Sequence, residues 1–157
     1  MNTRHLPRSR RLLGAALLAL ALYAPLAPAD VVLIANSRSS VDKLSQEQAV
    51  NIFMGRYRKL PDGSAARPLD LDANSPGRRL FYRALIDKTL EEVNAYWMRL
   101  IFAGRTPPPL MTTGEEEMLA MVASDPQVIG YLERSQLTRL ERNPLARNIK
   151  IVLSLPE

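Results

Sequence analysis

The stretch VVLIANSRSSVDKLSQEQAVNIFMG, residues 31–55, decides how this chain folds. Its first five residues, Val31–Ala35, are apolar and rich in β-branched side chains, which predicts a strand buried on both faces of a sheet. A polar loop follows, and Ser45 and Gln48 then have the spacing of a capping box before an apolar helical run that Gly55 ends. A buried strand that leads into a short amphipathic helix is typical of an α/β protein.

The same alternation continues toward the carboxyl end. Leu69 and Leu71 alternate with Asp70 and Asp72, which predicts a strand whose carboxylates point away from the core. Ser75 and Pro76 have the preferred order for the start of a helix. Two further helices are expected to begin at capping boxes, formed by Thr89 with Glu92 and by Thr113 with Glu116. Two more strands are expected at residues 129–132 and 149–153.

Because strands and helices interleave, we expect an α/β fold: an open mixed sheet that is flanked by helices on both faces. The length of 157 residues corresponds to one domain. Tyr96 and Trp97 lie on the apolar stripe of their helix and are expected to pack in the core.

The first 29 residues have the organisation of an export signal. A basic segment from Arg4 to Arg11 precedes the apolar stretch Leu12–Ala24, and Ala27-Pro28-Ala29 matches a cleavage site. We therefore predict a signal peptide over 1–29, cleaved after Ala29, and a periplasmic or secreted domain over 30–157. The apolar stretch is too short to span a membrane, so no membrane span is expected in the mature form.

Composition excludes several kinds of chemistry. The chain has no Cys, and its one His, His5, lies in the predicted signal peptide, so we expect no thiol or His catalysis, no cofactor and no metal centre. Four of the 21 basic residues and none of the 16 acidic ones precede Asp30, which leaves a net charge of +1 from there on. A nearly neutral domain gives no reason to expect nucleic-acid binding.

Four segments, in this order, resemble one lobe of the periplasmic phosphate-binding proteins that serve ABC transporters. They are Leu44–Arg56, similar to that family's L-S-x-x-x-L-x-x-I-F-x-G-K/R; the turn Pro61-Asp62-Gly63; Ser75 with Arg78, Phe81 and Tyr82; and Val122–Tyr131, similar to V-x-x-x-P-x-x-I-G-Y. The resemblance covers most of residues 31–153. It implies a single lobe of a periplasmic-binding-protein-like fold and an anion site at helix amino termini, where free N–H groups favour oxyanions.

Following this resemblance, we expect an anion to be bound by residues at two strand-to-helix junctions. These candidate ligands are Ser39, Ser40, Ser75, Gly77 and Arg78. The phosphate loop departs from the pattern R-S-x-G-S-G-T, because Leu71 stands at its arginine position and Pro76 at a glycine position. A Ser-Pro helix cap with solvated arginines and an ordinary Ser-rich turn are the plainer interpretations of these residues.

The resemblance implies a non-enzymatic, exported solute-binding lobe that binds phosphate or a similar small oxyanion weakly. The alternative is a protein interaction module without a ligand, which docks on an ABC permease, a sensor kinase or another envelope protein. Arg56, Tyr57, Arg58 and the segment Pro107–Pro109 are the expected contact points, since Tyr and Arg are enriched at interface hot spots. A homodimer that completes the missing second lobe is a further alternative.

Overall fold

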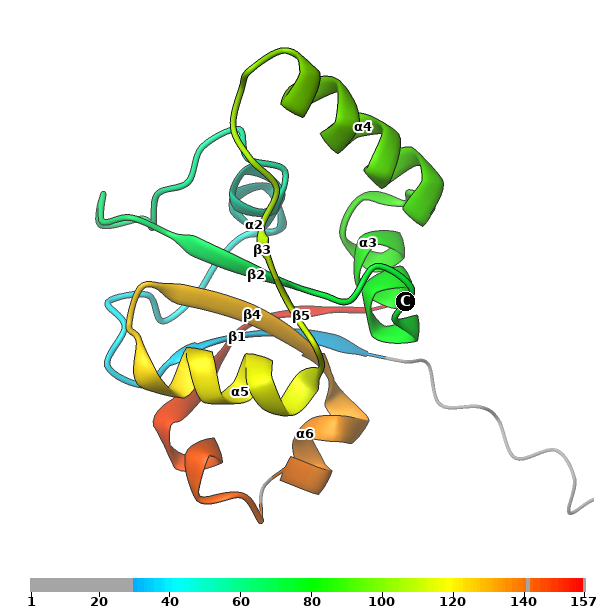
Figure 1. Ribbon diagram of the computed structural model, residues 1–157. Coiled ribbons are helices and arrows are strands. Elements are labelled where there is room, and N and C mark those ends of the chain that lie inside the picture. Colours follow the sequence, from blue (N-terminus) through cyan, green and yellow to red (C-terminus); the bar gives the residue numbers. More distant parts are fainter. Residues whose placement is uncertain (1–29, 141, 157) are drawn as a thin grey trace, which may run out of the picture.

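The computed structural model describes residues 30–140 and 142–156, so the predicted signal peptide lies outside the described residues. Strands and helices alternate along the chain, and Figure 1 labels them. The elements are β1 (Val31–Asn36), α2 (Gln46–Phe53), β2 (Arg67–Leu71), α3 (Pro76–Ile86), α4 (Leu90–Phe102), β3 (Leu110–Thr112), α5 (Glu115–Ser124), β4 (Val128–Glu133), α6 (Arg134–Leu140), a 3₁₀ helix (Pro144–Asn148) and β5 (Ile149–Leu155).

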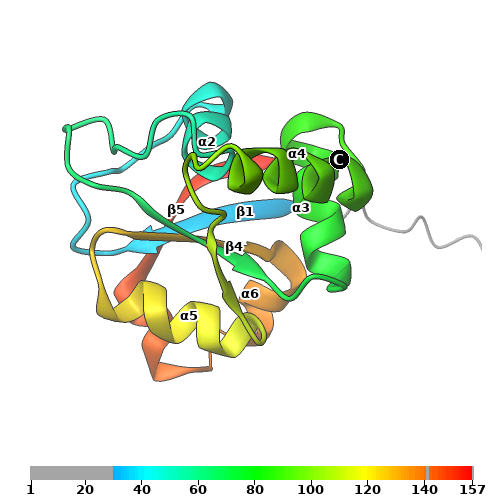
Figure 2. The same ribbon diagram turned by 45° about the horizontal axis from the view of Figure 1, so that its top comes forward.

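One five-stranded mixed sheet forms the centre of the molecule, in the order β3-β2-β4-β1-β5. β2 runs parallel to both β3 and β4, whereas β1 runs antiparallel to β4 and β5. Helices α2, α3 and α4 cover one face of the sheet, and α5 and α6 cover the other (Figures 1 and 2). The predicted open mixed sheet with helices on both faces is thereby confirmed.

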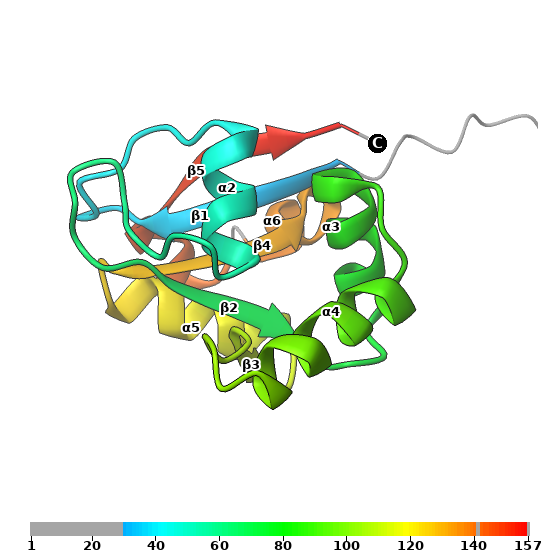
Figure 3. The same ribbon diagram turned by 90° about the horizontal axis from the view of Figure 1, so that it is seen from above.

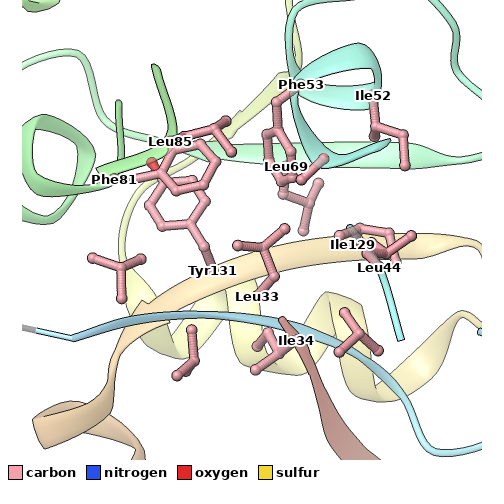
Figure 4. Packing of buried hydrophobic residues seen from close by; sticks show 14 of the residues in the cluster. Leu33, Ile34, Leu44, Ile52, Phe53, Leu69, Phe81, Leu85, Ile129 and Tyr131 are labelled. Carbon is pink, nitrogen blue, oxygen red and sulfur yellow. The ribbon is translucent and has the colours of Figure 1, made fainter. Parts of the chain in front are cut away.

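The core lies on both faces of the sheet, with α2 and α3 packed on one face and α5 on the other. β1 is buried along its whole length, as its apolar run predicts. Phe81 of α3 stacks on Tyr131 of β4 with ring centroids 3.8 Å apart, and Phe53 of α2 packs edge-on against Phe81 at 4.7 Å (Figure 4). Trp97 is buried and Tyr96 half-buried, which confirms that their helix turns this stripe toward the core.

Local capping signals set most helix boundaries. The capping boxes of Ser45 with Gln48 and of Thr89 with Glu92 are both formed. The predicted box of Thr113 with Glu116 is wrong, because Gly114 is the N-cap of α5 and Thr113 bonds to Glu117 instead. The carboxylate of Glu117 reaches back over the first turn and satisfies the backbone N–H of Thr113, which leaves Glu116 exposed.

The prediction that Asp70 points to solvent is also wrong. Asp70 is 2% exposed, whereas Asp72, which follows the strand, is exposed. The side of β2 that carries Asp70 is covered by α3, whose Arg78 and Tyr82 donate to the Asp70 carboxylate. Alternation of Leu and Asp therefore does not mark a solvent-facing side here. Among the described residues, no helix is both long enough and apolar enough to cross a bilayer.

Candidate functional site

The candidate site lies at the edge of the sheet where β2 and β3 end. Because these two strands are parallel, their carboxyl ends meet at the same edge. β2 leads through residues 72–75 into α3, and β3 leads through residues 113–114 into α5. Two helix amino termini therefore face this edge, which is where ligands of open α/β sheets bind.

Asp70 is the centre of a buried polar cluster just inside this edge. Its carboxylate accepts hydrogen bonds from the Nε of Arg78 at 2.9 Å and from the hydroxyls of Tyr82 at 2.9 Å and Tyr131 at 2.5 Å. The backbone N–H of Leu71 donates to the same carboxylate at 3.0 Å. These donors come from α3, β4 and β2, so the cluster joins one helix to two strands.

The guanidinium of Arg78 is nearly buried, and its Nε and Nη1 are hydrogen-bonded within the protein. Its side chain is 5% exposed, and its Nη1 donates to the carbonyl of Ala73 at 3.3 Å and to the Oδ1 of Asn94 at 3.1 Å. The guanidinium also lies 5.3 Å from the centre of the Tyr82 ring. Burial is the largest single effect and acts to lower the pKa of Arg78, but the charge and hydrogen bond of Asp70, together with Tyr82 and Tyr131, outweigh it and leave that pKa raised. Arg78 is thus a charged partner of Asp70.

The two tyrosines of the cluster act as neutral donors. Burial, followed by the nearby charge of Asp70, raises the pKa of Tyr82 and of Tyr131 well above the usual value. Ionisation would place a second negative charge beside Asp70 in a dry environment. The cluster is therefore a satisfied structural unit and offers no group poised for acid–base chemistry at neutral pH.

Ser75 and Gly77 lie at the first turn of α3, as predicted. Ser75 is the N-cap, Pro76 follows it, and the Ser75 side chain makes no capping hydrogen bond. A Cβ on buried Gly77 would lie 3.0 Å from the Cδ1 of Leu71 and 3.7 Å from the Oε1 of Glu115. An apolar side chain and a carboxylate of this chain therefore already stand in front of the helix terminus.

Glu115 makes this edge unfavourable for an anion. Burial, together with the charge of Glu133, raises the pKa of Glu115, and Arg139 opposes this shift. Burial is the larger cause of this shift, and the charge of Glu133 adds to it. An anion bound at this edge would meet the charge of these carboxylates when they are ionised. The three acidic residues in the first turn of α5 interact with that helix's dipole.

Ser39 and Ser40 lie elsewhere. They follow β1, which is antiparallel to β4, so they sit at the opposite edge of the sheet from Ser75. The hydroxyl of Ser40 donates to the Oδ2 of Asp62 at 2.5 Å, and buried Ser39 accepts a bond from Lys150 on its carbonyl. The hydrogen bonds from Ser40 and Ser64 lower the pKa of Asp62 to about 2. The structure therefore brings Ser75, Gly77 and Arg78 together without Ser39 and Ser40, and their roles in binding stay predictions.

Sequence reasoning missed Asp70, Tyr82 and Tyr131 as a unit. One signal was present, because Arg78 and Tyr82 are four residues apart on one face of α3 and both need a buried partner. Within residues 30–140 and 142–156, no group of three or more His, Cys, Asp or Glu side chains is placed to hold a metal ion.

Several solved protein structures superpose on this chain and share its fold. An ABC-type phosphate transport receptor from Vibrio cholerae superposes with a TM-score of 0.56 at 14% identity, over 82% of this chain and 55% of that one. A Clostridium perfringens protein solved with bound phosphate gives a TM-score of 0.55 at 14% identity, over 83% of this chain and 56% of that one. PstS from Borrelia burgdorferi gives 0.54 at 14% identity, over 80% and 48%.

This chain has the fold of a phosphate-binding protein lobe. It spans about half the length of the proteins it matches, so it corresponds to part of each of them. No protein-family model matches the sequence, and no curated protein matches it either. At 14% identity, the phosphate-binding-protein likeness establishes the fold, and the function has to be argued from the site.

Proposed function

We propose that this chain is an exported, non-enzymatic binding-protein lobe that works by contact with another envelope protein and does not capture phosphate. One observation carries this proposal. Arg78, the one arginine among the predicted anion ligands, is held by Asp70 inside the protein. Releasing it for a ligand would leave Asp70 buried without its cation, which is strongly unfavourable.

The predicted contact residues support an interaction role because the fold brings them together. The Nη2 of Arg58 donates to the carbonyl of Pro107 at 2.5 Å, which joins the segment after α2 to the segment after α4. Tyr57 beside it is 59% exposed. An ABC permease, a sensor kinase or an outer-membrane protein is the kind of partner that this proposal implies for a periplasmic lobe.

Weak binding of phosphate or a similar oxyanion at α3 is the second candidate. Two observations favour it: the Ser75 hydroxyl makes no capping bond, and a protein with this fold was solved with phosphate bound. In this version the ligand would meet Ser75 and the backbone N–H of Gly77, and Arg78 would contribute its N–H alone. A homodimer that supplies a second lobe stays a prediction.

Thermal unfolding of residues 30–157 during titration with phosphate, against sulfate and chloride at constant ionic strength, separates the two candidates. Ligand at about 100 times its Kd would add about 2.7 kcal/mol and raise Tm by several degrees. The interaction proposal predicts non-saturating effects, with phosphate raising Tm no more than sulfate does. A saturable rise specific to phosphate that Ser75→Ala removes and Ser124→Ala retains would contradict it and establish the second candidate.

A further inference from the structure

Two stretches of the chain that contain no acidic residue meet at one end of the molecule. Residues 48–61 and 93–114 have neither Asp nor Glu. They are joined by the hydroxyl of Tyr96, which donates to the carbonyl of Met54 at 2.8 Å, and by the bond from Arg58 to Pro107. In Figure 1 this end is at the top, where α4 ends and the chain turns toward β3.

This end of the molecule is basic, and its cations are not neutralised. Arg56, Lys59, Arg99 and Arg105 are all exposed. The ion pairs found among the described residues involve other cations, namely Arg67, Arg78, Arg83, Lys88, Arg134 and Lys150. The near-neutral charge of the whole domain therefore conceals a local excess of positive charge.

Large apolar side chains project from the same region. Phe102 is 83% exposed, and Met98 and Ile101 on the same helix are 49% and 48% exposed. Val93 and Trp97 of α4 are buried in the core, whereas Met98 and Phe102 lie on the outer side of the helix and Ile101 follows Trp97 by one turn. Figure 3 shows α4 at the periphery, with the sheet on one side of it only. We call the exposed set Arg56, Lys59, Arg99, Arg105, Met98, Ile101 and Phe102 the α4 face.

A groove of about 540 Å³ opens beside the α4 face, between α2 and α4. Val50, Met54 and Val93 contribute apolar side chains to its lining. Its charged lining residues are Arg56, Arg99, and Lys88 with Glu92, which form an ion pair with each other. An apolar hollow with guanidinium groups suits a ligand that is anionic at one end and hydrocarbon at the other.

We propose that the α4 face docks on a membrane surface that contains anionic phospholipid. Basic residues interspersed with protruding Phe, Ile and Met are the combination that binds lipid interfaces, because the cations attract the headgroups while the apolar side chains enter the acyl boundary. An acidic protein would use the cations too, but Phe102 and Met98 project outward instead of lining a hollow for a partner's side chain. The inference goes beyond the proposed function, because it assigns the α4 face to a lipid surface, whereas the proposed function assigns the lobe a protein partner.

Sedimentation with lipid vesicles tests the proposal. Residues 30–157 contain the whole sheet and core and lack the apolar stretch 12–24, which would bind lipid by itself. Vesicles of phosphatidylglycerol and phosphatidylcholine are compared with vesicles of phosphatidylcholine alone, and soluble polyglutamate is the protein-like competitor. We expect binding to the anionic vesicles that weakens as salt rises, with little binding to the neutral ones.

Matched variants locate the surface. The double variant Arg99→Gln, Arg105→Gln removes two cations of the α4 face and should weaken binding roughly thirtyfold. Phe102→Ser should weaken it about tenfold. Lys43→Gln, Arg147→Gln makes the same charge change at exposed sites outside the face and should leave binding unchanged.

Three outcomes would overturn the proposal: no binding to anionic vesicles, equal loss in the Lys43 and Arg147 control, or tight binding to polyglutamate without binding to vesicles. The last would indicate an acidic protein partner. None of these outcomes depends on free inorganic phosphate, which is absent from the assay. A failure here is therefore distinct from a failure of the proposed function, which a phosphate-specific rise in Tm would reveal.

Discussion

Asp70 and Arg78 form an ion pair that is buried on both sides, with the Oδ2 and Nε atoms 2.9 Å apart and the two side chains 3% and 5% exposed. Arg78 lies in the first turn of α3, where the sequence resemblance predicts an anion site. The partner of its guanidinium is a carboxylate of the chain itself. The position that looks most like a phosphate ligand in the sequence is therefore part of the core.

Asp70→Asn should destabilise the protein by about 3–5 kcal/mol, because Arg78 is then left buried without a counter-charge. Urea unfolding measures the change. Asp72→Asn is the matched control, since Asp72 is exposed two residues away, and it should change the free energy of unfolding by less than about 0.5 kcal/mol. Equal effects of the two substitutions would show that the pair does not hold the core.

Stability should fall as the pH rises above about 10, where tyrosines ionise in the unfolded chain. The pKa values of Tyr82 and Tyr131 are raised in the folded protein, so there these side chains keep their protons while the unfolded chain loses them. The unfolded state then binds fewer protons, and the free energy of unfolding decreases with pH. Urea unfolding between pH 8 and 11 should show this slope.

Replacing both tyrosines with Phe tests whether Tyr82 and Tyr131 cause this loss of stability at high pH. The double variant Tyr82→Phe, Tyr131→Phe should be less stable at pH 8, because Asp70 loses two donors, but its stability should depend less on pH above 10. Tyr57→Phe, at an exposed site, should retain the wild-type slope. A slope that the double variant leaves unchanged would contradict the assignment.

Ser40→Ala should raise the pKa of Asp62 from about 2 toward the usual range, because the hydroxyl of Ser40 is the largest contributor to the lowered value. Carboxyl chemical shifts of Asp62, followed by NMR over pH 1–6, measure it. Ser64→Ala should give a smaller rise, and Ser154→Ala, far from Asp62 in the sheet, none. A pKa unaffected by Ser40→Ala would mean that this hydroxyl is free, as a role in binding an anion requires.

Gly55→Ala should destabilise the protein more than Gly104→Ala. Both glycines have positive φ, 68° and 62°, so both substitutions strain the backbone. At Gly55 the new Cβ would also lie 2.9 Å from the ring of Trp97, whereas at Gly104 nothing lies within 4 Å. The difference in Tm between the two variants measures the packing of α4 on the segment after α2. Equal decreases in Tm would contradict the contact between Gly55 and Trp97.

Sequence patterns predicted the fold well where the signal is local. The apolar run Val31–Ala35 and the capping boxes at Ser45 and Thr89 depend on nearby residues, and all three are confirmed. The resemblance to phosphate-binding proteins likewise agrees with the structural comparisons. The 3₁₀ helix and α6 were not predicted, because segments this short carry little periodicity.

The site was harder to predict because it depends on which strand ends lie on the same side of the sheet. Ser40 and Ser75 look alike in the sequence, but β1 runs antiparallel to β4 and carries Ser40 to the far edge of the sheet. Asp70 has the alternation of an exposed residue, yet Arg78 and Tyr82 of α3 and the hydroxyl of Tyr131, 61 positions away, enclose it. Strand order and long-range partners are not encoded in local spacing.

The most direct test of the account is NMR of ¹⁵N-labelled residues 30–157 during titration with phosphate, observing the Nε–H of Arg78 and the backbone N–H of Gly77. If Asp70 holds Arg78 as described, the Nε–H signal stays in place and exchanges slowly with water at every phosphate concentration. Saturable movement of both signals at low phosphate, absent with sulfate, would show that Arg78 leaves Asp70 for a ligand and would contradict the central claim.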